Sequence, residues 1–153
     1  MLIIRSKLDY IDTGTKMKKT KRLHERQIEN LLKQSPGQRY EYFIRYCADF
    51  EQVWGLVVGE DNWVIFKDNN GDEIFPLWPH PDLARACCFV EHKQMGAHPQ
   101  PMGLKSFIQN CIPDMVTGGV LFGIFYNDSR EGLVVGGESL KAALEEEVRS
   151  VWE

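Results

Sequence analysis

Three short segments rich in β-branched and aromatic residues follow one another in the middle of the chain. Composition of this kind predicts β-strands, at Val53–Val58, Asn62–Lys67 and Glu73–Leu77. The links between them are short and polar, and the second contains Asn70-Gly71, the typical signal of a two-residue type I′ hairpin. The stretch therefore predicts an antiparallel three-stranded meander.

Helices are predicted on both sides of this meander, where apolar residues recur at helical spacing. The first runs from Lys21 to about Gln34 and is charged. Ser35 begins the second, because Pro36 needs no amide partner at the first helical position and Gln38 can complete a capping box. Later helices are predicted at residues 81–90, with Val90 on the buried side, and at residues 104–112 and 138–152.

Two more strands are predicted at residues 119–126 and 132–135, and residues 92–103, rich in His, Pro and Met, are predicted as a loop. Strands joined by hairpins and interleaved with helices are typical of an α+β fold. The predicted fold is therefore α+β, with a mainly antiparallel sheet of about five strands packed against helices.

The chain of 153 residues is long enough for one domain. Residues 1–19 show no sustained period and end in a lysine cluster, which indicates a flexible N-terminal extension, and Met17 is an alternative start. We expect residues 20–153 to form a single α+β domain.

Charge and cysteine content narrow the function classes. Residues 1–22 carry seven Lys or Arg against two Asp or Glu, a net charge of +5, whereas residues 23–153 carry eleven against twenty, a net charge of −9. An acidic body argues against binding nucleic acid, which needs a basic surface. The sequence contains neither a signal-peptide core nor a membrane-spanning stretch. Four cysteines without a secretory signal indicate reduced thiols in a cytoplasmic protein.

Motifs with catalytic or metal-binding chemistry are weak. The acidic tip at residues 68–73 lacks the spacing of a calcium loop and fits a polar hairpin turn better. Cys88 and His92 lie four residues apart on a predicted helix, but no further pair of ligands accompanies them. We therefore assign no catalytic residue, no metal site and no cofactor.

The tryptophans of the central stretch are the remaining candidates for a site. Trp54 and Trp63 lie on two strands of the meander, and Trp78 with His80 forms a Trp-Pro-His corner after the third. Tryptophan in a strand is most often a packing residue. The alternative is a partly exposed aromatic patch, so Trp54, Trp63, Trp78 and His80 are tentative binding residues for a partner or small ligand.

Several segments, in this order and spacing, resemble the bacterial family known as domain of unknown function 2750, over about residues 21–152. They are Arg26–Asn30, Arg39–Phe43, Glu51–Leu56, Gly71, Pro76–His80, Val120–Phe125 and Gly132–Val135. The resemblance implies a small single-domain bacterial protein without an established activity, and it brings no catalytic residue to this chain. Gly136-Gly137 departs from the Thr-Pro start that the family has at the last helix.

Two functions from different classes remain. The first is a non-catalytic protein-binding or regulatory module of the immunity or accessory kind, which would bind a protein partner and neither nucleic acid nor membrane. The alternative is a small hydrolase or small-ligand-binding protein that uses a pocket near Trp78-Pro79-His80. An enclosed cavity lined by His80 and a buried carboxylate would favour the enzyme, and a filled corner would favour the module. The sequence leaves the oligomeric state open.

Overall fold

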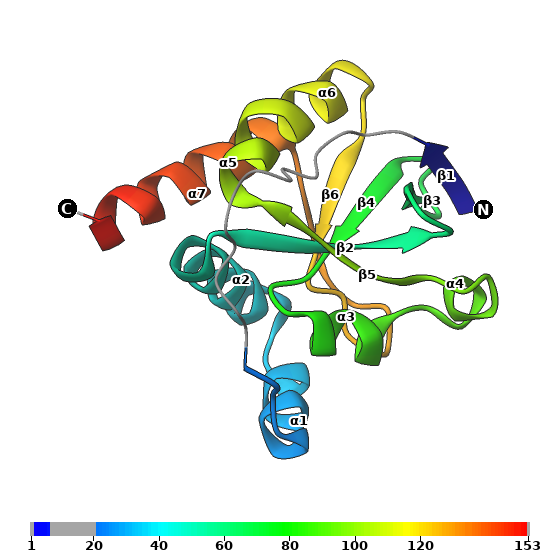
Figure 1. Ribbon diagram of the computed structural model, residues 1–153, viewed down its shortest axis with the longest axis horizontal. Helices are drawn as coiled ribbons and strands as arrows, with labels where there is room; N and C mark the ends of the chain where they lie inside the picture. The colour runs from blue at the N-terminus through cyan, green and yellow to red at the C-terminus, as the bar shows by residue number, and fades with distance from the viewer. Residues whose placement is uncertain (1, 7–20, 153) are drawn as a thin grey trace.

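The computed structural model describes residues 2–6 and 21–152, and the side chains of residues 21–150 (Figure 1). The predicted flexible extension, residues 1–19, falls largely outside the described residues, so its mobility stays a prediction. Its described part, β1 (Leu2–Ser6), pairs antiparallel with β3. The single domain over residues 20–153 also stays a prediction, although the buried apolar side chains of the described residues form a shared core.

The sheet is mixed and mostly antiparallel. Six strands follow the order β5-β2-β3-β4-β6-β7, and β1 pairs with β3 outside this order. β4 and β6 are parallel, and the other strand pairs are antiparallel. The strands are β2 (Gln52–Val58), β3 (Asn62–Lys67), β4 (Glu73–Leu77), β5 (His98–Gly103), β6 (Leu121–Ile124) and β7 (Leu133–Val135). The predicted α+β class with a mainly antiparallel sheet is confirmed, but the order contains six strands and not about five, because the sequence predicts β5 as a loop.

β2, β3 and β4 form the predicted meander, and each contacts the other two. Next to their turn, β2 and β3 form two residue pairs, and β3 and β4 also form two. Beyond these pairs the neighbouring strands diverge. Trp54 in β2 then forms an isolated antiparallel bridge with Trp78, directly after β4. The indole ring of Trp63 lies in the space between the three strands, close to Gly55 and Phe75.

The turn between β3 and β4 is not the predicted type I′ turn. Gly71 has a φ of +83°, but Asn70 is not among the non-glycine residues with positive φ in the described part of the chain. The carboxylate of Asp68 instead accepts hydrogen bonds from the amides of Asn70 and Asp72, at 3.0 and 2.9 Å. This local hydrogen bonding favours a longer turn, closed between Asp68 N and Asp72 O at 2.9 Å.

β5 corrects the prediction of a loop over residues 92–103. It pairs with β2 through six residue pairs, from Gln52↔Gly103 to Val57↔His98. Pro99 and Pro101 lie two residues apart and therefore face the same way, and neither has an amide to donate. A proline fits in this ladder only at a position whose amide would point away from β2. Pro99 and Pro101 occupy such positions, so the outer edge of β5 lacks two amide donors.

Helices lie on both sides of the sheet (Figure 1). α2 (Pro36–Phe50) and α7 (Gly137–Trp152) confirm their predicted positions, and Ser35 with Gln38 forms the predicted capping box. α1 (Glu25–Lys33) lies beyond α2, away from the sheet (Figure 1). The residues predicted as one helix to Val90 form α3 (Pro81–Cys87) and α4 (Val90–Gln94), separated at Cys88 and Phe89. Val90 is 63% exposed and not buried as predicted.

The helix predicted at residues 104–112 continues past Pro113. It consists of α5 (Leu104–Ser106), the π-helical turn η1 (Phe107–Cys111) and α6 (Ile112–Thr117). Proline at this place removes one helical hydrogen bond, which is why the sequence predicts an end here. The wider turn of η1 ends at Cys111, two residues before Pro113, and a π turn of this kind accommodates the disruption without ending the helix.

Candidate functional site

The four predicted site residues differ in how much of them solvent reaches. Trp63 is fully buried, with its ring centroid 5.9 Å from that of Phe75. Trp54 is half-buried, and its backbone exchanges two hydrogen bonds with Trp78, at 2.8 and 3.0 Å. Trp78 and His80 are each 1% exposed. The corner is thus an interior feature of the fold, and a binding role for these residues stays a prediction.

Trp78 lies at the carboxyl end of β4, beside the carboxyl end of the parallel strand β6. Its indole Nε1 donates to Tyr126 O at 3.0 Å, and Phe125 N donates to Leu77 O at 2.8 Å. The carboxyl ends of parallel strands are where ligands often bind in open sheets. In this protein the chain's own tryptophan occupies that position.

Arg39 closes the same edge from α2. It is 1% exposed, and its Nε donates to Phe125 O at 3.0 Å while Nη2 donates to Glu131 O at 2.7 Å. A third bond runs from Nη1 to Gln34 O. Burial lowers the pKa of Arg39, partly offset by Cys87 and Glu131. The sequence analysis missed this residue, although it precedes the core residues Phe43 and Cys47 at spacings of four and eight on one helical face.

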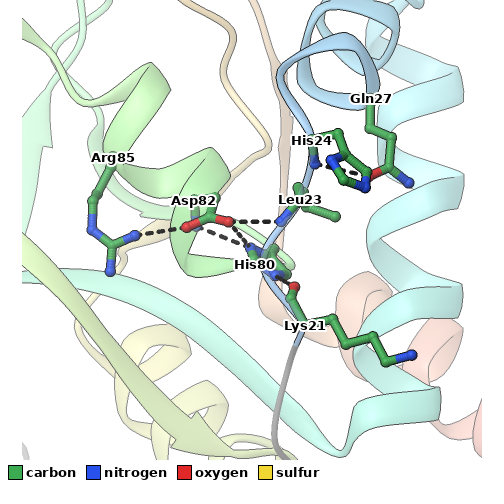
Figure 2. Close-up of polar contacts among 7 residues, drawn as sticks. All are labelled: Lys21, Leu23, His24, Gln27, His80, Asp82 and Arg85. Atoms are coloured by element: carbon green, nitrogen blue, oxygen red, sulfur yellow. Dashed lines mark hydrogen bonds and ion pairs between the residues drawn. The ribbon is translucent and has the colours of Figure 1, made fainter.

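His80 caps the N-terminus of α3. Its Nδ1 accepts a hydrogen bond from Asp82 N at 3.0 Å, and its Nε2 lies 2.7 Å from Lys21 O (Figure 2). A carbonyl oxygen only accepts, so Nε2 carries the proton and Nδ1 does not. Burial is the main cause that lowers the pKa of His80. Both ring nitrogens are therefore engaged with the protein backbone.

Asp82 connects α3 to the segment before α1. Its Oδ2 accepts from Leu23 N at 2.9 Å, and its Oδ1 accepts from Arg85 Nη1 at 2.8 Å. In Figure 2 the carboxylate lies between these two donors, with His80 beside it. Together His80 and Asp82 fix residues 21–23 against the start of α3.

An open groove of about 580 Å³ lies next to this attachment. One wall consists of the segment before α1 and the start of α1, and the other wall is α3. Apolar side chains and charges of both signs line it: Arg22, Leu23, His24, Glu25 and Ile28 on the first wall, and Asp82, Arg85 and Ala86 on the second. The sequence analysis did not find this groove, because its walls meet across 59 residues of chain.

Cys88 and His92 do not form the pair that one continuous helix would have allowed. The chain leaves helical geometry at Cys88, where ψ is 130°, and His92 stacks on Phe89 with 5.2 Å between ring centroids. Within the described residues, no group of three or more His, Cys, Asp or Glu could hold a metal ion. Nor is any helix of the described part long and apolar enough to cross a membrane.

All four cysteines are free and buried. Burial raises the pKa of each thiol, to about 12 for Cys87. Because the thiolate is the reactive form, we expect the native protein to react with a thiol reagent such as Ellman's reagent about 100-fold more slowly than the denatured protein. Absorbance at the thionitrobenzoate band follows the reaction. One equivalent of thiol that reacts as fast in native as in denaturing buffer would contradict this expectation.

Comparison with known proteins adds one finding. A family model described as "Protein of unknown function (DUF2750)" matches residues 40–144, which covers more than half of the chain. The match includes the corner and α3 but neither α1 nor the segment before it. No curated protein and no solved structure matches the chain.

Proposed function

The chain belongs to the family described as Protein of unknown function (DUF2750), and we propose that it is a non-catalytic protein-binding module of the regulatory or accessory kind in the bacterial cytoplasm. Its partner inserts an amphipathic helix into the groove between α1 and α3. The observation that supports this function most is the filled corner, where Trp78, His80 and Arg39 hydrogen-bond to the chain itself.

The groove supports the choice of partner. Leu23, Ile28 and Ala86 offer apolar contacts between the two walls, and two arginines and two carboxylates supply charges of both signs around them. An apolar centre with a polar rim is the usual composition of a protein interface, and a helix in a groove is a recurring mode of peptide recognition. Because Arg22 and Arg85 balance Glu25 and Asp82 around the groove, we propose that the polar side of the inserted helix carries charges of both signs.

The alternative is a small hydrolase or small-ligand-binding protein that uses a pocket near Trp78-Pro79-His80. It is a second candidate because the groove reaches Asp82, two residues beyond His80. Against it, the groove is open, His80 does not line it, and both nitrogens of His80 are engaged. A general base needs a free nitrogen within reach of its substrate.

The test of the module compares two exposed positions. Ala86 lines the groove and Val90 lies on α4, outside the lining, and both are exposed. A protein recovered from the extract of the source cells is purified and titrated calorimetrically against wild type, Ala86→Lys and Val90→Lys. We expect one-to-one binding that Ala86→Lys weakens at least about tenfold, as for a central interface contact, and that Val90→Lys leaves unchanged.

Equal affinity of the wild type and Ala86→Lys would remove the groove from the proposal. Hydrolysis of p-nitrophenyl acetate or p-nitrophenyl phosphate that His80→Asn abolishes without unfolding the protein would establish the alternative.

A further inference from the structure

Hydrogen bonds hold both ends of the segment from Lys21 to Gln34, which includes α1, to the rest of the described chain. Two hydrogen bonds hold its start, His80 Nε2 to Lys21 O at 2.7 Å and Leu23 N to Asp82 Oδ2 at 2.9 Å. A third, from Arg39 to Gln34 O, holds its end. α1 lies away from the sheet (Figure 1); Leu31 is buried, and Ile28 and Leu32 pack partly buried against the core, as Leu23 does just before the helix. The apolar side chain that detaching residues 21–24 would expose is that of Leu23.

The contact that His80 makes with the start of α3 depends on one protonation state of its ring. The neutral ring has a single proton, on Nε2, and donates it to Lys21 O. Its Nδ1 uses a lone pair to accept the amide proton of Asp82. A second proton would have to occupy Nδ1, where it would meet that amide N–H at a nitrogen-to-nitrogen distance of 3.0 Å.

The charged and titratable groups around His80 come from each element packed against it. α3 contributes Asp82, whose Oδ2 lies 3.7 Å from Nδ1, and Arg85. α2 contributes Tyr46, whose ring meets the imidazole edge-on at 6.0 Å between centroids. The N-terminal segment contributes the carbonyl of Lys21. Lys21 O and Asp82 favour the protonated ring, but burial disfavours it more strongly, so the pKa of His80 is lowered.

We propose that His80 is a pH-sensitive latch, whose protonation releases residues 21–24 from α3 and opens the wall of the groove that they form. The proton comes from solvent and binds Nδ1. The ring then turns its new N–H towards Asp82 Oδ2, the same oxygen that accepts Leu23 N. The cap on Asp82 N is lost, the new N–H competes with Leu23 N for this oxygen, and the turn of the ring moves Nε2–H away from Lys21 O.

The direction of the pH dependence follows from linkage. In the released form His80 is solvated and its pKa returns towards the ordinary value of 6.5, above that of the latched form. The released form therefore binds the proton more tightly, and acid favours release. Residues 21–24 are fully attached to α3 above about pH 6.5, and this attachment is lost as the pH falls through the lowered pKa of His80 in the latched form. This inference concerns His80 and the segment alone, and it holds whether or not a partner docks in the groove.

The test is amide hydrogen exchange followed by NMR at about pH 7.5 and about pH 5, corrected for the intrinsic pH dependence of exchange. In the wild type, protection of the Leu23 amide is expected to fall at least about fivefold at the lower pH, the factor for one lost hydrogen bond. His80→Asn keeps an acceptor for Asp82 N but cannot reach Lys21 O and does not titrate. It is expected to show low protection of Leu23 at both pH values, while the amides of β3 and β4 stay protected.

His92 is a matched control, because it is also buried with a lowered pKa but lies on α4. His92→Gln is expected to keep the pH-dependent loss at Leu23. In the wild type, the NMR titration of the His80 ring and the change at Leu23 are expected to share a midpoint. The proposal is overturned if Leu23 protection does not depend on pH, if the two midpoints differ, or if His80→Asn keeps the wild-type protection at neutral pH.

Discussion

Replacement of Arg39 by methionine is expected to lower the free energy of unfolding by about 3–5 kcal/mol. Methionine preserves most of the apolar stem but none of the five N–H donors. The carbonyls of Phe125, Gln34 and Glu131 would then lose their hydrogen bonds to the guanidinium, and Phe125 O lies in a fully buried contact. An acceptor left unsatisfied in the interior costs its whole desolvation energy, which makes this loss larger than that of a surface arginine.

Urea denaturation followed by tryptophan fluorescence measures this change. Arg45 is the matched control, because it lies on the same helix with an exposed side chain. Arg45→Met is expected to change the free energy of unfolding by no more than about 0.5 kcal/mol. A loss below about 1 kcal/mol for Arg39→Met would show that the three carbonyls find other donors, such as water.

The elements with strong local signals could be predicted from the sequence. α2 begins where Ser35 and Pro36 predict it, because capping and the geometry of proline involve only neighbouring residues. β3 and β4 have the predicted bounds, since β-branched and aromatic composition is also a local property. The resemblance to the family was confirmed by the match over residues 40–144.

The features that depend on distant partners could not be predicted. β5 is a strand because β2 offers it a ladder, and its two prolines removed the local signal. The parallel pairing of β4 with β6 joins residues about 47 apart, as at Ile74↔Leu121. The same limit applies to the site. Nothing next to His80 in the sequence indicates that the backbone of Lys21 covers it, and nothing next to Trp78 indicates Tyr126.

Gly132→Ala is expected to lower the free energy of unfolding by about 2–3 kcal/mol through overpacking. A Cβ at this position would lie 2.2 Å from Cδ1 and 2.7 Å from Cε1 of Tyr126. The ring cannot move away freely, because it contacts the rings of Phe66 and Phe89 at 5.7 and 5.8 Å between centroids and covers Gly123. Because Gly132 has no side chain, the chain can pass close to the ring of Tyr126 just before it enters β7, which pairs with β6.

Two comparisons separate this steric cause from a general effect of removing glycine. Gly37, near the start of α2, has nothing within 4 Å of its ideal Cβ, so Gly37→Ala is expected to raise the free energy of unfolding by about 0.5–1 kcal/mol. Combining Gly132→Ala with Tyr126→Ala is expected to cost less than the two single changes together, because the smaller side chain makes room for the new methyl group. Urea denaturation of the four variants measures both comparisons. Strictly additive costs would show that the loss does not come from the space that Tyr126 occupies.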